Sequence, residues 1–191
     1  MITTALQFLL HTILGLFTIA VLLRFYLQLT NAPFHNPVSQ TIIALTNFAV
    51  RPIRRVMPSW GGLDLSTLFL AYFSQLLLHL GLLLTRDFPL FVAGQSVWFA
   101  ILGLALVGII KFSIYIFLYA VILQAILSWF HQQTIISPVL YALTRPVMRP
   151  VQNLVPRLGG VDLSPLVIFI IAELILILFI TPTEIRILRL L

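Results

Sequence analysis

One short pattern occurs twice in this chain, and each copy lies between long apolar runs. Residues 44–66 and 142–164 align without a gap and are identical at 11 of 23 positions, whereas chance gives about one or two identities in a window of this length. The copies belong to longer linkers, 36–66 and 137–164, whose arginine, proline and glycine residues contrast with the hydrophobic residues around them. A duplication of this kind predicts a protein built from two related halves.

The composition places the protein in a membrane. Hydrophobic residues make up 61% of the 191 residues and charged residues 8%, whereas a soluble globular domain carries roughly a quarter charged residues. The net charge of +6 comes mainly from arginines in the two linkers, a distribution that reports membrane orientation rather than nucleic-acid binding. The absence of cysteine from the sequence excludes disulfides, thiolate metal sites and redox-active thiols.

The apolar segments are long enough to form membrane-spanning helices. Their approximate ranges are 4–29, 64–84, 107–130 and 164–180. The first linker between them has a weak amphipathic stripe, which is typical of a helix lying at the membrane surface. We therefore predict an all-α membrane protein of two tandem repeats, 1–87 and 88–191. Each repeat consists of a spanning helix, a basic interfacial helical linker and a second spanning helix, about four crossings in total.

The middle apolar run, 88–130, is about twice as long as one crossing requires. Its first part, 89–106, can lie in the outer interface, enter and return, or cross outright, and these three possibilities remain open. Charge favours four crossings, because both linkers then lie on one side, which the positive-inside rule identifies as cytoplasmic. We expect the linker arginines to contact lipid headgroups or partner proteins. They are Arg51, Arg54, Arg55, Arg145, Arg149 and Arg157.

Each linker ends in the motif Gly-Gly-x-Asp-Leu-Ser, just before a spanning helix. Paired glycines allow a sharp turn, and Asp or Ser after them is typical of a helix N-cap. A catalytic role for Asp64 is the alternative to this structural interpretation. The glycines do not form a phosphate loop, because no lysine or further glycine accompanies them. The predicted capping turns comprise Gly61, Gly62, Asp64, Ser66, Gly159, Gly160, Asp162 and Ser164.

Prolines predict where helices stop. Asn36 and Pro37 have the residue types of an N-cap and a first helical position. Pro52 is expected to interrupt the first linker helix, because the residue before a proline avoids the helical region. Pro182 is likewise expected to end the fourth span, which leaves 184–191 as a short amphipathic tail.

Three ionisable residues inside the predicted spans form a candidate intramembrane polar site, namely Glu173, Lys111 and Arg24. A charge in hydrocarbon is costly unless it is paired, neutralised or in contact with water. Glu173 can serve a proton or cation relay with Lys111 as its partner, or it can be a protonated carboxyl hydrogen-bonded to a neighbouring helix. Arg24, one turn from the end of its helix, either snorkels to the interface or pairs across the bundle.

Other candidate chemistry rests on fewer residues. His11 and His79 fall towards the same half of neighbouring predicted helices, where imidazoles can ligate haem or a metal. We favour hydrogen bonding between helices, since neither histidine has a companion at ligand spacing. The sequence has no catalytic triad order, metalloprotease motif, catalytic carboxylate pair or dinucleotide loop. We therefore expect no enzymatic activity and no cofactor.

The duplicated pattern resembles that of the YggT (YlmG) family. The resemblance rests on Asn-Pro or Ser-Pro at the linker start, then Arg-Pro, then Pro-x-x-Gly-Gly-x-Asp-Leu-Ser, in both copies. The first copy departs from the commoner ending, because Thr67 stands where the second copy has Pro165. The resemblance implies a multi-pass protein of the bacterial cytoplasmic membrane, with relatives in plastids. Family members have been linked to osmotic tolerance and potassium uptake, to cell or plastid division, and to assembly of a b-type cytochrome, and the family offers no catalytic residues.

Two functional hypotheses follow. The leading one is a non-enzymatic organiser or assembly factor for membrane complexes, whose partners are membrane lipids and either membrane proteins or a second copy of the chain, without nucleic acid. The alternative is a component of potassium uptake or osmotic-stress tolerance, as a small oligomeric transporter or channel. That alternative rests on Glu173 and Lys111 and on the interrupted spans, since broken helices at repeat interfaces mark transporter binding sites.

Overall fold

The computed structural model describes the whole chain except residues 87, 90–93, 130–133 and 156–161. The described part is helical and contains no strand beyond an isolated bridge between Trp60 and Leu63. The helical elements are α1 (Ile2–Leu29), α2 (Pro37–Val56), α3 (Leu65–Leu84), α4 (Gln95–Trp129), α5 (Ser137–Leu154), α6 (Ser164–Ile175), the π-helix η1 (Leu176–Ile180) and α7 (Thr181–Leu188).

Four helical stretches of the described chain are long and apolar enough to cross a membrane. They are Ile2–Leu29, Leu65–Leu84, Gln95–Trp129 and Ser164–Leu188. Each has at least the roughly 20 residues that a bilayer about 30 Å thick requires. The predicted architecture of two repeats, each with a linker helix between two spanning helices, is therefore confirmed.

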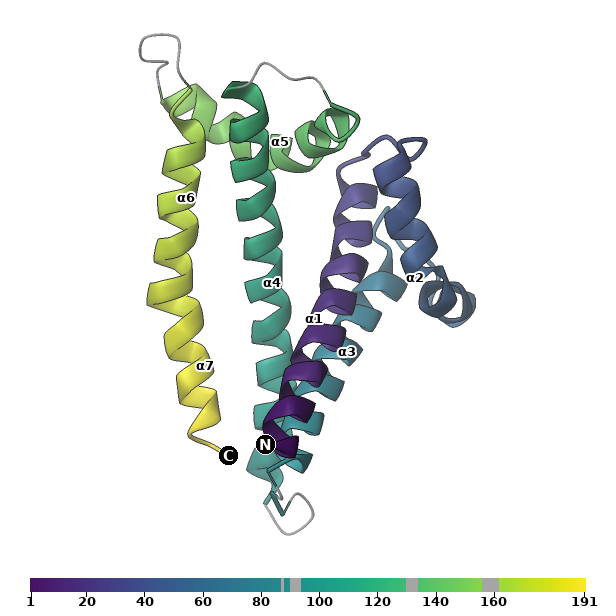
Figure 1. Cartoon of the computed structure of the whole chain (residues 1–191), viewed down its shortest axis with the longest axis vertical. Coiled ribbons are helices and arrows are strands. Elements are labelled where there is room, and N and C mark those ends of the chain that lie inside the picture. The colour runs from purple at the N-terminus through teal and green to yellow at the C-terminus, as the bar shows by residue number, and fades with distance from the viewer. Residues whose placement is uncertain (87, 90–93, 130–133, 156–161) are drawn as a thin grey trace.

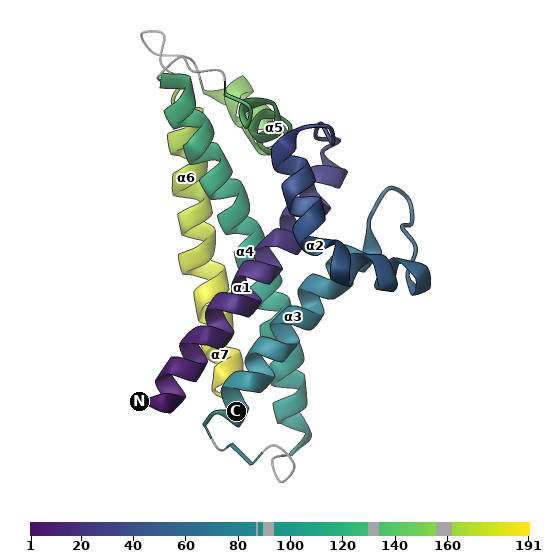
Figure 2. The same ribbon diagram turned by 45° about the vertical axis from the view of Figure 1, so that its right-hand side comes forward.

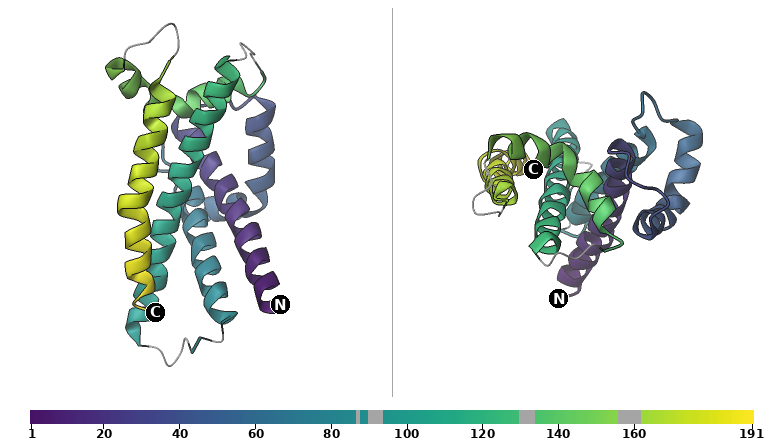
Figure 3. Two further views of the ribbon diagram at one scale, coloured as in Figure 1. Left: turned by 60° about the vertical axis from the view of Figure 1, so that its left-hand side comes forward. Right: turned by 90° about the horizontal axis from the view of Figure 1, so that it is seen from above.

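The spanning helices form a broad, shallow bundle (Figure 1). α1 and α3 pack against each other, α4 lies beside them, and α6 with its continuation α7 packs on α4. The two linker helices, α2 and α5, lie towards one end of the bundle, and both chain termini lie at the other (Figures 1 and 3). The structure thus places the two duplicated linkers on the same side.

The first part of the middle apolar run belongs to α4. Residues 95–106 continue without a break into the predicted helix 107–130, so the prediction that the helix begins near Val107 is wrong. No proline lies within Gln95–Trp129, and its two glycines do not interrupt the backbone hydrogen bonding. At 1.5 Å per residue, 35 residues extend about 50 Å, which exceeds the hydrocarbon core and requires α4 to tilt or to project beyond it.

The fourth span does not end at Pro182, as the sequence led us to expect. Helical structure runs through α6, η1 and α7 to Leu188. Proline lacks an N–H and its ring crowds the carbonyl four residues earlier. The wider π-helical turn just before Pro182 is the kind of local adjustment by which a spanning helix accommodates a proline. The predicted tail is therefore part of the span up to Leu188.

Pro52 does not end the first linker helix either. α2 begins as predicted, with the Asn36 side chain accepting a hydrogen bond of 2.9 Å from the N–H of Val38 and with Pro37 in the first turn. It continues past Pro52 to Val56, and Pro58 follows its end. The helix changes direction near its C-terminal end (Figure 2), which is the kink that an internal proline produces.

The main hydrophobic core joins both repeats. It lies where α1, α3 and α4 meet the inner faces of the two linker helices. Its buried members are Val21, Leu22, Val50, Leu70, Ala71, Ile109, Ile116, Ala120, Leu140 and Leu143. Each linker helix is therefore fixed to the bundle along one apolar side, and its polar side remains available at the surface.

Candidate functional site

The first linker is anchored by Arg24. Its guanidinium Nη1 donates to Thr46 Oγ1 at 2.9 Å, to Asn47 Oδ1 at 3.0 Å and to the Ile43 carbonyl at 3.3 Å. Only 7% of Arg24 is exposed. The side chain therefore ends on α2, and the three groups that accept its hydrogen bonds are neutral.

The second linker has the corresponding attachment without a charge. Gln124 of α4 accepts a hydrogen bond from the hydroxyl of Thr144 on α5. Thr144 aligns with Thr46 in the duplicated segment. In both repeats the same threonine of the linker therefore binds a long polar side chain near the end of the preceding span, arginine in the first repeat and glutamine in the second.

A second attachment joins each linker to the turn that follows it. Arg54 forms an ion pair with Asp64, whose side chain is fully buried. At the aligned positions, Gln152 Nε2 donates to Asp162 Oδ2 at 2.8 Å. The motif aspartate thus holds the end of the linker helix in both copies, again with a cation in the first repeat and an amide in the second.

The predicted helix caps are only partly as expected. Asp64 occupies the N-cap position of α3, but its side chain makes no capping hydrogen bond and binds Arg54 instead. The Ser66 hydroxyl donates to the Met57 carbonyl at 2.6 Å. In the second copy the N-cap of α6 is Leu163, not Ser164, and Asp162 just before it accepts a hydrogen bond of 2.9 Å from the Ser164 N–H through its Oδ1. Ion pairing competes with capping for the same carboxylate.

The paired glycines of the first copy make the predicted sharp turn. Gly61 and Gly62 have φ values of +59° and +87°. The flanking Trp60 and Leu63 exchange two backbone hydrogen bonds of 3.0 Å. Positive φ at both central residues is the pattern of a type I′ turn, which glycine adopts without steric cost. The equivalent Gly159 and Gly160, like Arg157, lie outside the described residues.

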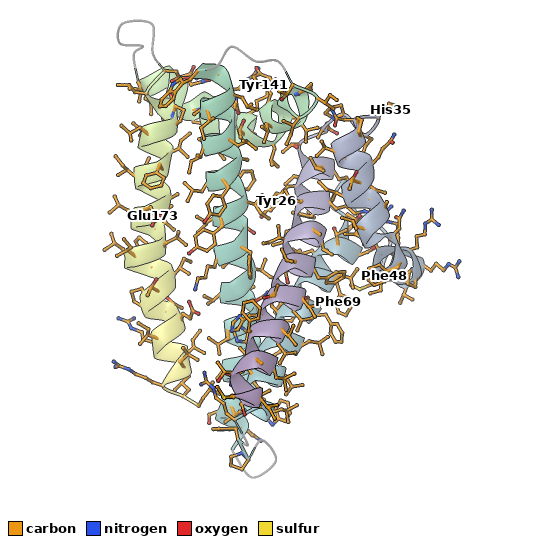
Figure 4. All side chains as sticks on the ribbon, in the orientation of Figure 1. Tyr26, His35, Phe48, Phe69, Tyr141 and Glu173 are labelled. Carbon is orange, nitrogen blue, oxygen red and sulfur yellow. The ribbon has the colours of Figure 1, made fainter. Side chains whose placement is uncertain are left out.

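Four linker arginines form an exposed basic surface. Arg51 and Arg55 lie on α2, and Arg145 and Arg149 lie on α5. Arg51 and Arg149 occupy aligned positions of the duplication. The linkers also touch each other, because Asn36 Nδ2 donates to the carbonyl of Ile135 at 2.6 Å. We call these four exposed arginines, Arg51, Arg55, Arg145 and Arg149, the linker surface; they belong to two linkers that contact each other. The apolar ring of Phe48 and the phenol of Tyr141 mark the two linkers in Figure 4.

The structure does not bring the predicted intramembrane pair together. Lys111 Nζ lies 2.7 Å from Glu184 Oε2, so its partner is on α7 and not Glu173. Both side chains of this pair are about one-third exposed. Within the described residues Glu173 makes neither a hydrogen bond nor an ion pair. Sequence reasoning missed Glu184 because Pro182 suggested that the span had already ended.

A buried polar cluster between α1 and α3 also escaped sequence reasoning. Gln75 Nε2 donates to Thr18 Oγ1 at 3.0 Å, and Ser74 Oγ donates to the Leu14 carbonyl at 3.1 Å. Gln75 packs against Gly108 of α4, where an added Cβ would lie 2.4 Å from its Oε1. Hydrogen bonds of this kind join helices inside a bilayer. The adjacent polar residues Ser74 and Gln75 within an apolar span were the available signal.

An apolar cavity of about 360 Å³ lies where α1, α4 and α5 meet. Its walls include Leu23 of α1, Tyr115 and Tyr119 of α4, and Leu143 of α5. Among the residues that the structure describes, no three His, Cys, Asp or Glu side chains are grouped so that they could hold a metal ion. The polar side chains described above instead join spanning helices to the linkers or to each other.

Comparison with known proteins gives one family and several bacterial relatives. The family model described as CCB3/YggT matches residues 3–85 and again residues 103–183. A protein of Vibrio alginolyticus, described as an uncharacterized protein in the proC 3′ region, is 36% identical over 169 residues, which are 87% of this chain and 88% of the relative. An uncharacterized protein of Pseudomonas aeruginosa is 33% identical over 91% of this chain and 87% of its own length. The Escherichia coli K12 protein YggT, also described as uncharacterized, is 31% identical over 89% of this chain and 86% of its own length. No solved structure matches the chain.

Proposed function

The chain belongs to the CCB3/YggT family, and we propose that it is a non-enzymatic organiser of membrane complexes in the bacterial cytoplasmic membrane. The observation that carries the proposal is the linker surface, a set of exposed arginines on the two duplicated helices, which both begin towards the same end of the bundle. Basic residues in short segments between spans favour the cytoplasmic side. On this proposal the linker surface contacts anionic lipid headgroups and membrane-protein partners there.

The way the linkers are held supports a binding role. Arg24 and Gln124 hold the middle of the linker helices through Thr46 and Thr144, and the motif aspartates hold their C-terminal ends. A surface held at two points on each helix loses little conformational freedom on binding, and preorganisation of this kind favours affinity. Arg54 takes no part in the proposed surface, because its charge is already paired with Asp64.

Charge reversal tests the proposal. Arg51→Glu combined with Arg149→Glu changes the two aligned arginines of the linker surface, while Arg86→Glu makes a similar change at the opposite end of the bundle. The expected result is that a partner recovered reproducibly by crosslinking in intact membranes is lost with the double variant and retained with Arg86→Glu. Equal recovery with all three proteins, at equal amounts in the membrane, would refute the organiser proposal.

A transport role is the second candidate, and the Lys111–Glu184 ion pair favours it. Lys111 lies near the middle of α4, and its partner follows the π-helix η1 by four residues. Ionisable residues inside spans mark ion pathways in many membrane proteins, and π-helical turns are frequent at functional sites. Potassium flux into proteoliposomes should then fall with Glu184→Gln, and Glu173→Gln reports whether the unpaired carboxyl contributes. Equal background flux for all three proteins would exclude transport.

A further inference from the structure

Helix α6 carries a carboxyl group that has no partner within the described chain. Glu173 lies nine residues after the start of α6, which places it about 14 Å along the helix and near the middle of a hydrocarbon core about 30 Å thick. Its side chain is partly exposed, and it makes no hydrogen bond or ion pair with any described residue. Figure 4 labels it on the outermost helix of the bundle. A lone carboxyl at this depth is costly, and a hydrogen bond to a polar partner lowers that cost.

The cations inside the spans are not available to Glu173. Arg24 binds α2, and Lys111 is paired with Glu184. Arg186 lies 13 residues further along the same helical stretch, and it is therefore separated from Glu173 by roughly 20 Å. Within the described residues no cation is therefore free to pair with Glu173, which directs attention to a polar partner on another molecule.

The face of α6 that carries Glu173 is only partly covered by the rest of the bundle. The packed side of the helix is marked by the buried Ser164 and Ile168. At 100° per residue, Glu173 is turned by about 140° from Ile168. Only 17% of the most apolar window of Ser164–Leu188 is buried, against 39% in α3 and in α4. α6 lies at the edge of the molecule when seen along the bundle (Figure 3).

We propose that α6 is the contact helix between two copies of this chain, and that Glu173 of each copy hydrogen-bonds to Glu173 of the other. Two copies inserted in the same membrane have the same orientation, so a twofold axis along the membrane normal brings identical residues to the same depth. Two ionised carboxylates would repel each other. One carboxyl is therefore protonated, and its O–H donates to the carboxylate of the second copy.

The sequence of α6 shows why the carboxyl is important for this contact. Lipid chains are as apolar as leucine, so spanning helices associate through small residues or through polar contacts. α6 has no glycine, and large residues surround Glu173, including Phe169, Ile170 and Leu174. A polar contact supplies the specificity that small residues supply elsewhere. The inference is independent of the proposed organiser role and concerns only how the chain associates with itself.

Single cysteines test the contact without interference, because the chain has no native cysteine. Ile170 and Leu166 lie one and two turns before Glu173, and 49% and 57% of their surfaces are exposed. Leu16 of α1, which is 62% exposed, is the matched control on a different helix. In vesicles that contain only the purified protein, Ile170→Cys and Leu166→Cys should form disulfide-linked dimers on oxidation, and Leu16→Cys should not.

The role of the carboxyl is tested in the Ile170→Cys background. Glu173→Leu should weaken dimerisation about 3-fold to 20-fold, the range that interhelical hydrogen bonds in membranes provide. Glu173→Gln should retain the dimer, because a carboxamide both donates and accepts. Crosslinking of the α6 cysteines no stronger than that of Leu16→Cys would overturn the proposal, and would point to lipid or a different protein on this face. Crosslinking unaffected by Glu173→Leu would overturn the assigned role of the carboxyl. The comparison of cysteine positions retains Glu173, so it does not depend on how the Glu173→Leu variant folds.

Discussion

Replacing Gly108 with alanine tests whether close packing between α3 and α4 holds the two repeats together. A Cβ at this position would lie 2.4 Å from Gln75 Oε1 and 3.1 Å from Gln75 Cδ. Gln75 is only 1% exposed, so its amide cannot move into solvent and has to shift among its packed neighbours. The side chain must shift, and its 3.0 Å hydrogen bond to Thr18 is lost or distorted.

The size of the effect follows from three terms. Overpacking of a well-packed site costs about 1 to 3 kcal/mol. Loss of a hydrogen bond between spanning helices costs about 0.6 kcal/mol on average. The higher helix propensity of alanine offsets about 0.8 to 1.0 kcal/mol. The net expectation is that Gly108→Ala lowers the free energy of unfolding by about 0.6 to 2.8 kcal/mol.

Reversible unfolding of the purified protein in mixed micelles measures this change. Gly15→Ala in α1 is the matched control. A Cβ at Gly15 would lie 3.7 Å from Cζ of Phe112 in α4, which is an ordinary van der Waals contact. Gly15→Ala should leave stability unchanged or raise it slightly. In a Gln75→Ala background, Gly108→Ala should lose most of its effect, because the shortened side chain leaves room for the new methyl group. A Gly108→Ala protein as stable as Gly15→Ala, or equally destabilised with and without Gln75, would refute the reasoning.

Two further changes probe the first linker. Arg54→Ala should lower the free energy of unfolding by about 1 to 3 kcal/mol, because it leaves the buried carboxylate of Asp64 unpaired. The loss is smaller than for a fully buried pair, since solvent partly screens the exposed Arg54 side. Arg54→Gln, which introduces the residue type of the aligned Gln152, should recover at least half of that loss. Chemical unfolding measures the stability of both variants. Equal losses would contradict the inference that Arg54 and Gln152 hold the motif aspartate in the same way. Gly62→Ala should lower the free energy of unfolding by about 1 to 2 kcal/mol, because its φ of +87° strains any side chain. Gly61→Asn should lower it less, because asparagine tolerates a φ of +59°. Thermal unfolding gives the order of the two variants, and the reverse order would contradict the turn assignment.

Much of the fold follows from patterns that the sequence displays directly. The span lengths, the duplicated linkers and the Asn36 cap depend on local physical chemistry, namely hydrophobicity, amphipathic spacing and the hydrogen-bonding preference of one side chain. These determinants act within a few residues of each other. The four spans and the helical linkers were predictable for that reason, and the structure confirms them.

Two of the incorrect predictions, the helix ends at Pro52 and at Pro182, share a physical cause. Pro52 and Pro182 were expected to end helices because proline disfavours helix in isolation. In the structure, tertiary packing holds α2 together, and a π-helical turn absorbs Pro182. Because the span continues, Glu184 reaches Lys111, a contact between residues 73 positions apart that spacing cannot reveal. The Arg54–Asp64 pair was missed in a different way, because the local capping preference of aspartate concealed its competing partner.

The central claim is that the duplication places both arginine-bearing linkers at the same face of one membrane, and site-directed labelling tests it most directly. Single cysteines at Gln40 of α2, Arg145 of α5 and Arg86 beyond α3 lie at exposed positions of a chain with no other cysteine. Each is treated with a membrane-impermeant maleimide in intact spheroplasts and in inverted vesicles. The account predicts that Gln40→Cys and Arg145→Cys react only in inverted vesicles, and that Arg86→Cys reacts only in spheroplasts. Reaction of the two linker cysteines from opposite sides would contradict it.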